Sequence, residues 1–177
     1  AESGSQSVTI TITENESAPT VTLATSANSI AENAGSSLTL TATLSVATTA
    51  DVTVGISTSG TGTEGTDYST ISDITISAGA TTGTATFTPT DDSVYEGNET
   101  ATITMASITG ANAGSTTSQT ITITENDSTP VVTLATAASS IAENAGSSVT
   151  LTATLSNATT ANVTVTLSTS GTGTEGT

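Results

Sequence analysis

The sequence contains no lysine, arginine, histidine or cysteine, and these absences exclude several classes of function. Nucleic-acid binding is excluded because no cationic side chain is present to replace the counterions of the phosphates. The same lack argues against docking on an anionic membrane surface. Without cysteine, neither disulfides nor thiolate metal ligands can stabilise the fold. No apolar run approaches about 18 residues, so we expect no membrane insertion in this segment.

The acidic residues are unopposed, because the 177-residue chain has 16 Asp and Glu side chains and a formal net charge of −16. Such a chain needs a neutralising partner, and two kinds are available: metal cations or a basic protein surface. No basic stretch followed by an apolar stretch is present, so no signal peptide is visible. If the protein is secreted, we expect its export signal to lie outside this segment.

Aromatic residues make up only 2% of the chain, yet its apolar residues recur with a clear period of two. Residues 38–44 alternate Leu or Ala with Thr, which is typical of a strand buried on one face. Turn-forming Gly and Asn residues separate similar segments. About seven strands at this spacing predict an all-β, two-sheet antiparallel sandwich, with Tyr68, Phe87 and Tyr95 as its large core residues. The strands expected from this alternation include residues 38–44, 52–56, 74–76, 85–87, 101–105 and 121–123.

The sequence repeats itself at an offset of 111 residues. Residues 21–66 align with residues 132–177, and only seven of the 46 aligned pairs differ. Self-similarity over such a long period is typical of tandem structural repeats. We therefore predict three parts, which are the last strand of a preceding repeat, one complete repeat and the truncated first part of a following repeat, at residues 1–18, 19–129 and 130–177.

Pro19 and Pro130 occupy equivalent positions between the predicted repeats. Proline does not fit a central strand, so both residues predict short, stiff linkers. We therefore expect the neighbouring repeats of the same chain to be partners of one another, together with other copies if the protein forms a fibre.

Most acidic residues fall at the ends of the expected strands, and residues 91–99 alone hold four of them. Alternate connections of a sandwich return to the same end, so we expect these carboxylates to converge on one pole. With no cationic side chain nearby, they would repel one another or raise one another's pKa. Ca²⁺ relieves this repulsion because it takes about six to eight oxygen ligands in flexible geometry, whereas Mg²⁺ keeps its waters and Zn²⁺ favours His and Cys. The carboxylates expected to converge are those of Glu32, Asp67, Asp92, Glu96, Glu99, Glu125 and Asp127, while the isolated Glu2, Glu64 and Glu175 are interpreted as solvated surface charges.

These segments together resemble the Calx-beta domain. The likeness lies in Glu32 after an alternating strand, in the Gly-Thr-Asp-Tyr segment 65–68, in the acidic run 91–100 and in the closing segment 121–127. The resemblance implies an immunoglobulin-like sandwich that binds several Ca²⁺ ions at one pole of each complete repeat. By the same resemblance, the ligands would be the side chains of Glu32, Asp67, Asp92, Glu96, Glu99 and Asp127, joined by Asp91, Glu125 and the backbone carbonyl of Val94.

Repeated Calx-beta domains in a cysteine-free chain rich in Thr and Ser resemble the bacterial surface-protein branch of the family. This resemblance implies a secreted, extracellular adhesin or fibre, in which the repeat is a calcium-stiffened extender module. An alternative is a ligand-binding repeat that uses exposed Thr-rich strand faces to bind a glycan or ice. We expect no catalysis, because the chain has no His, Lys or Cys to act as base or nucleophile and few aromatic residues to line a substrate pocket.

Overall fold

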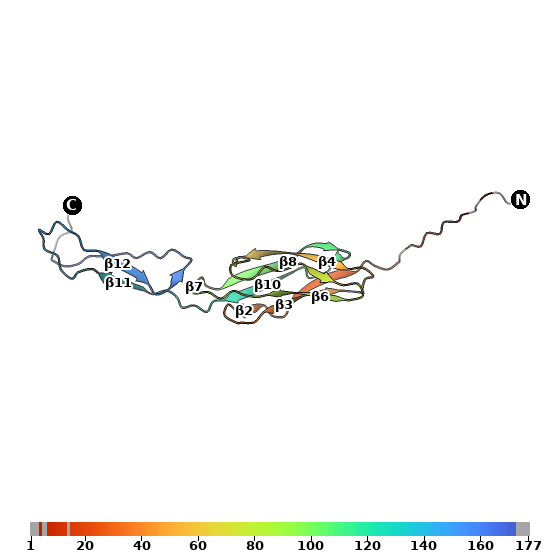
Figure 1. The fold of residues 1–177 in the computed structure, drawn as a ribbon, viewed down its shortest axis with the longest axis horizontal. Helices are drawn as coiled ribbons and strands as arrows, with labels where there is room; N and C mark the ends of the chain where they lie inside the picture. The colour runs from red at the N-terminus through yellow and green to blue at the C-terminus, as the bar shows by residue number, and fades with distance from the viewer. Residues whose placement is uncertain (1–3, 5–6, 14, 173–177) are drawn as a thin grey trace.

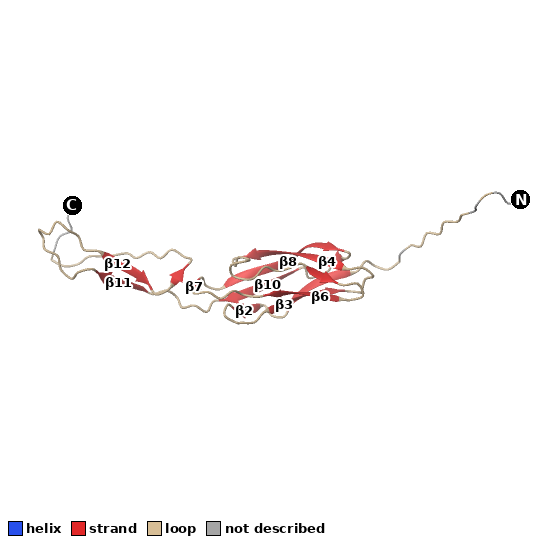
Figure 2. Ribbon diagram, in the orientation of Figure 1, coloured by secondary structure: helices blue, strands red, loops and turns tan. Residues whose placement is uncertain are grey.

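The computed structural model of the chain describes residue 4, residues 7–13 and residues 15–172. Every regular element in this described part is a β-strand, and no helix within it is long and apolar enough to cross a membrane. Ten of the strands lie in the predicted complete repeat (Figures 1 and 2). In chain order they are β1 (Thr20–Thr25), β2 (Ser29–Ala31), β3 (Leu38–Leu44), β4 (Val52–Gly60), β5 (Ile74–Ile76), β6 (Thr82–Phe87), β7 (Val94–Tyr95), β8 (Glu99–Thr109), β9 (Asn112–Ala113) and β10 (Ser118–Thr124).

Two sheets pack face to face and form the predicted immunoglobulin-like sandwich. One sheet has the strand order β6-β3-β1-β9, and the other has the order β2-β10-β8-β4-β5. The longer pairings are antiparallel, as the sequence pattern predicts, whereas the short pairings β1–β9 and β2–β10 are parallel. These parallel pairings place the first and last segments of the repeat side by side, with β2 and β10 both ending next to the acidic segments 32 and 125–127.

The core lies between the two sheets because the period-two pattern turns one side chain in two inward. In β3, Leu40 and Ala42 are fully buried, while Thr39 and Thr43, on either side of this pair, face solvent. The largest buried side chains are Tyr68 and Phe87, whose stacked rings have centroids 4.9 Å apart. Tyr95, predicted as a third large core residue, is instead only half-buried, because it lies in β7 outside both main sheets.

Beyond Pro130, the strands β11 (Val132–Thr136) and β12 (Leu151–Leu155) form a two-stranded antiparallel sheet. Its register repeats that of β1 with β3 pair for pair at the 111-residue offset, so that Val132 faces Leu155 as Val21 faces Leu44. The apolar side chains of this part are exposed, however, because no second sheet covers them: Leu134 is 53% exposed, whereas the equivalent Leu23 is 1% exposed.

Residues 7–13 form no strand, although their sequence matches that of β10. Ile10 and Ile12 are 82% and 92% exposed, whereas the equivalent Ile121 and Ile123 are buried in β10 between β2 and β8. The difference follows from the neighbours, since a strand needs partners for its backbone hydrogen bonds and cover for its apolar face.

Candidate metal centre

Six carboxylates at one pole of the sandwich fall into two groups of three. The first group is Glu32, Glu125 and Asp127, and the second is Asp67, Glu96 and Glu99. Within each group, one oxygen of every carboxylate lies within 4.8 Å of an oxygen of the other two. All six come from strand ends or from the connections next to them, so the sandwich topology itself brings together residues that are far apart in sequence.

The first group lies where β2 and β10 end side by side. The N–H of Glu32 donates to the carbonyl of Thr124 at 3.0 Å, which holds the backbone after β2 against the end of β10. Glu32 is only 8% exposed and is the one charged residue buried in the described part of the chain. Within the same part, the Oδ2 of Asp127 is buried and has no hydrogen-bond partner. A buried carboxylate oxygen without a partner is costly, so a cation or a proton at this atom would stabilise it.

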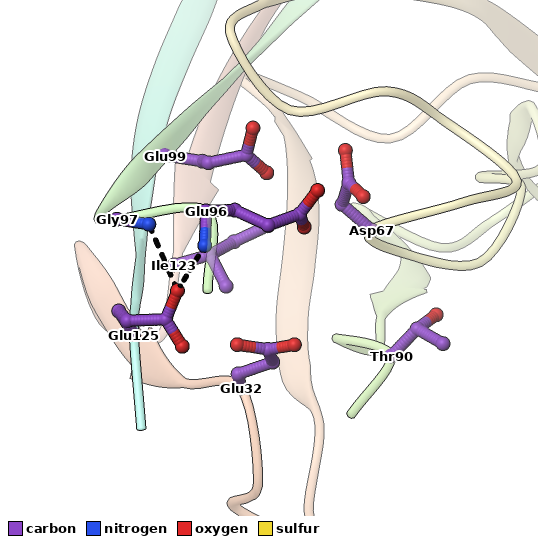
Figure 3. A pocket seen from close by; sticks show the side chains of 8 residues that line it. All are labelled: Glu32, Asp67, Thr90, Glu96, Gly97, Glu99, Ile123 and Glu125. Atoms are coloured by element: carbon purple, nitrogen blue, oxygen red, sulfur yellow. Dashed lines mark hydrogen bonds between the residues drawn. The ribbon is translucent and has the colours of Figure 1, made fainter. Parts of the chain in front are cut away.

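Glu125 organises the loop that carries the second group. Its Oε2 accepts the backbone N–H groups of Glu96 at 2.7 Å and Gly97 at 2.8 Å (Figure 3). Its Oε1 accepts the N–H of Asp127 at 2.8 Å. Desolvation acts to raise the pKa of Glu125, but the hydrogen bonds from Asp127, Glu96 and Gly97 outweigh it and lower the pKa. Glu125 is therefore held as an anion by the protein itself.

The second group is positioned by two tight turns. The Oδ2 of Asp67 accepts the N–H of Thr63 at 2.5 Å, which fixes the turn before the buried Tyr68. Glu96 precedes Gly97, whose φ of +80° is the left-handed conformation that favours glycine, and Glu99 then begins β8. In Figure 3 the carboxylates of Asp67, Glu96 and Glu99 point toward one another.

Mutual repulsion and burial perturb the protonation of the pole. Burial is the largest cause that raises the pKa of Glu32 to about 7, with added repulsion from Glu125, Asp92 and Asp127. Burial, then the charge of Asp67 and a hydrogen bond with it, raise the pKa of Glu99 to about 7. The pKa values of Glu96 and Asp127 are raised in the same direction, again first by desolvation and then by neighbouring carboxylates. Four neighbouring carboxylates thus have raised pKa values, which indicates a functional site where a positive charge would be stabilising.

A small cavity of about 10 Å³ joins the two groups. Such a volume holds a single water molecule or a bare ion of similar size. Figure 3 shows five carboxylates arranged around it, those of Glu32 and Glu125 from the first group and those of Asp67, Glu96 and Glu99 from the second. The residues that line this cavity are Glu32, Asp67, Thr90, Glu96, Gly97, Glu99, Ile123 and Glu125.

The donor set fits Ca²⁺ better than other common metals. All six grouped side chains are carboxylates, the hard oxygen ligands that Ca²⁺ takes in mono- or bidentate geometry. The chain has no His or Cys for Zn²⁺ or a soft metal. A divalent cation would also supply the partner that the buried Oδ2 of Asp127 lacks. The residues at the pole therefore suit a calcium site.

Three of the nine residues proposed as ligands from the sequence lie in neither carboxylate group. The Oδ1 of Asp92 accepts the N–H of Val94 at 2.7 Å, and the backbone N–H of Asp92 donates to Glu32 at 3.3 Å. Asp91 is exposed and accepts the side-chain amide of Asn126 at 3.3 Å. Asp92 still contributes to the electrostatics of the pole, because its charge helps to raise the pKa of Glu32. The structure thus gathers Glu32, Asp67, Glu96, Glu99, Glu125 and Asp127 in the two groups. Asp91 and Asp92 lie outside the groups but help to raise the pKa of Asp127, and Val94 lies in the same loop as both.

Sequence reasoning missed two polar residues of the pole. Thr90 lines the cavity, and the Oδ1 of Asn98 accepts the N–H of Glu125 at 3.0 Å. Asn98 was recognisable only as a turn signal beside Gly97, because its partner lies 27 residues away.

The interpretation of Glu64 as a solvated charge is wrong. Its Oε2 accepts the hydroxyl of Thr58 at 2.6 Å and its Oε1 accepts the N–H of Ile71 at 2.8 Å, so the half-buried carboxylate ties β4 to the segment before β5. The other two isolated acids, Glu2 and Glu175, lie outside the described residues.

Comparison with known proteins supplies a family and a fold. The family model of the Calx-beta domain matches residues 14–127. Among solved structures, the chain is similar to the apo form of the Calx CBD1 domain, with a TM-score of 0.52 and 18% identity over 61% of this chain and 99% of that one. It is also similar to the calcium binding domain CBD12 of CALX1.1, with a TM-score of 0.50 and 20% identity over 56% of this chain and 42% of that one.

At these identities, the two structural matches show a shared fold, and the second spans less than half the length of its counterpart. No match was found among curated proteins.

Proposed function

Because the chain belongs to the Calx-beta family, we propose that its acidic pole binds Ca²⁺ and that the protein is an extender module of a repetitive, extracellular surface fibre of the bacterial adhesin type. The observation that carries the calcium site is the buried Oδ2 of Asp127, which has no hydrogen-bond partner and belongs to a carboxylate grouped with those of Glu32 and Glu125. No cationic side chain exists in the chain to pair with it. A bound cation would therefore stabilise this atom in its ionised form.

The two carboxylate groups support the binding of more than one ion. Glu32, Glu125 and Asp127 would hold one ion, and Asp67, Glu96 and Glu99 would hold another across the shared cavity. Bound Ca²⁺ supplies the positive charge that lets Glu32 and Glu99 ionise without repelling their neighbours. Glu125 links the groups, because its carboxylate belongs to the first group and accepts the N–H of Glu96 from the second.

The position of the pole supports the extender role. Asp127 immediately precedes the linker residues 128–130, so an ion held by Asp127 and Glu32 would fasten the start of the linker to the end of β2. Calcium would then restrict the hinge between consecutive repeats and stiffen the fibre. In calcium-rich surroundings outside the cell, the same ions would stabilise the fold by mass action.

A calcium titration of the 177-residue chain, followed by thermal unfolding, tests this proposal. We expect the melting temperature to rise with Ca²⁺ and to respond much less to Mg²⁺. The Asp127→Asn and Glu99→Gln variants should each lose most of the rise. Asp51→Asn is the matched control, because it also removes one carboxylate, lies far from the pole in sequence, and has Asn162 at its equivalent position. An equal rise in all variants, or none in the unmodified chain at millimolar Ca²⁺, would refute the calcium site.

The alternative of a glycan- or ice-binding face has a weaker structural basis. The solvent-facing residues Thr39, Thr41 and Thr43 of β3 do lie opposite Thr86, Thr84 and Thr82 of β6 and form a regular array. However, outward Thr is also the ordinary polar face of a strand. Tyr68, an aromatic side chain on which a sugar could stack, is only 1% exposed. Binding of soluble glycans that survives replacement of Thr41 and Thr84 by Ala would exclude this array as the binding surface.

A further inference from the structure

A short strand that follows β12 pairs with the complete repeat. This strand, β13 (Ala158–Thr159), runs parallel to β7, with Ala158 opposite Val94 and Thr159 opposite Tyr95 (Figure 1). Among the strands of the described residues, the β13–β7 pair is the one that connects the part of the chain before Pro130 with the part after Pro130. β7 has no other strand partner in the described structure, so β13 covers an otherwise open edge.

The turn before β13 also fastens the linker. The side-chain amide of Asn157 donates to the carbonyl of Ser128 at 2.8 Å. The hydroxyl of Ser156 accepts the N–H of Val131 at 2.9 Å and donates to the Oδ1 of Asn157 at 2.8 Å. These contacts hold the linker against the same segment that presents β13. The orientation of the linker and the pairing of β13 with β7 are therefore set together.

The equivalent turn in the complete repeat keeps the serine but lacks the asparagine. Ser45 accepts the N–H of Thr20 at 3.0 Å, as Ser156 accepts that of Val131. Position 46, which corresponds to Asn157, is a valine that is 55% exposed and cannot donate a hydrogen bond. Asn157 is thus one of the few residues that distinguish the two copies, and it makes a contact that its counterpart cannot make.

We propose that residues 156–159 form a docking strand by which one repeat attaches to the β7 edge of the repeat before it, with Asn157 locking the linker in the docked orientation. Addition of a strand to an open edge is a common mode of recognition, in which backbone hydrogen bonds supply the affinity. Neighbouring domains with small interfaces otherwise move relative to one another. The docking strand removes part of that freedom at a cost of only a few ordered residues.

The docking surface adjoins the proposed calcium site, because β7 lies in the loop between Asp92 and Glu96. The docking is inferred from the pairing of β13 with β7 and the contact of Asn157 alone, whereas its coupling to Ca²⁺ rests on the proposed function. If Ca²⁺ orders this loop and thereby favours docking, then docking favours Ca²⁺ binding by the same factor.

Distance measurements between two spin labels on the 177-residue chain test the docking. The chain has no native cysteine, so Ala106→Cys and Thr152→Cys, both at exposed positions, would give the only two label sites. In metal-free buffer we expect a narrow distance distribution between the repeat and the β11–β12 sheet. Asn157→Val and Thr159→Pro should each broaden it at least twofold. Val46→Asn, the reverse exchange at the equivalent position, is the matched control and should leave it unchanged.

A distribution as broad in the unmodified chain as in both variants, with or without Ca²⁺, would overturn the docking strand. A dimer in light scattering that dissociates with Asn157→Val would also overturn it, because β13 would then dock on a second copy. A narrow distribution that depends on Asn157 supports docking even if the chain fails to bind Ca²⁺ in calorimetry, and that result would refute only the proposed function. Narrowing that appears only after Ca²⁺ is added, and that Asn157→Val abolishes, supports docking together with its coupling to the pole.

Discussion

The metal-free chain should become less stable as the pH rises from 5 to 8, which is the reverse of the usual behaviour of carboxylates in proteins. The reason is Glu32, whose pKa is about 7 in the folded chain against 4.5 for an unperturbed glutamate side chain. Between these two values, the folded state binds more protons than the unfolded state, so the free energy of unfolding falls as the pH rises. Glu99, with a pKa also raised to about 7, acts in the same direction. The lowered pKa of Glu125 acts only below this pH range.

The size of the effect follows from the pKa difference. A shift of one pKa unit corresponds to about 1.4 kcal/mol, so the 8% exposed Glu32 alone should account for a loss of about 2.5 kcal/mol between pH 5 and pH 8. For a domain of this size, such a loss lowers the melting temperature by about 10 °C. Saturating Ca²⁺ should invert the dependence, because the ligands must be deprotonated to bind the metal and acid therefore releases it.

The assay is thermal unfolding followed by circular dichroism, in buffers stripped of metal on a chelating resin, because soluble chelators bind Ca²⁺ poorly at low pH. Glu32→Gln should weaken the pH dependence, leaving the part that comes from Glu99, and should stabilise the metal-free chain at pH 8. Glu143→Gln is the matched control, since Glu143 is the repeat equivalent of Glu32 but is exposed. A metal-free chain that is equally stable or more stable at pH 8 than at pH 5 would refute the reasoning.

Three further predictions concern the same pole. Glu125→Gln should lower the stability of the metal-free chain at pH 7 by about 1–3 kcal/mol, because three backbone N–H groups stabilise this carboxylate as an anion. A variant that is more stable in urea unfolding would contradict this. Gly97→Ala should cost about 1–2 kcal/mol through its φ of +80° alone, because an added Cβ meets no atom within 4 Å; unchanged stability in the same assay would show that the turn adapts. Added NaCl should raise the melting temperature of the metal-free chain by screening the net charge of −16. A melting temperature that falls between about 0.02 and 0.5 M NaCl in calorimetric scans would count against repulsion at the pole.

The sandwich could be predicted from the sequence because its signals are local. The alternation of residues 38–44 reproduces the whole of β3, and the glycines of the predicted turns, such as Gly35 and Gly79, adopt positive φ values. The parallel pairings β1–β9 and β2–β10 could not be predicted in this way. They join segments about 90 residues apart, and no residue pattern within a short strand specifies its partner.

The acidic pole could be predicted in outline for a similar reason, since strand ends of a sandwich meet at its two poles. Its internal division could not be predicted. The role of Glu125 depends on the N–H groups of Glu96 and Gly97, which approach it only after β8 pairs with β10. The structural role of Glu64 depends in the same way on a loop closing over it. A sequence shows where carboxylates gather, whereas the folded backbone decides which of them already accept hydrogen bonds from backbone N–H groups.

The parallel pairing of β2 with β10 has a mechanical consequence. The chain enters the sandwich at one end and leaves it at the other, so a pull on the two ends loads these parallel strands in shear (Figure 1). The hydrogen bonds from Thr122 to Asn28 and from Glu32 to Thr124 would then carry the load together instead of parting one after another. Glu32 lies on one side of this shear plane, and Glu125 and Asp127 lie on the other. A cation held among them would be a cross-link across that plane, and its removal should lower the force at which a single repeat ruptures.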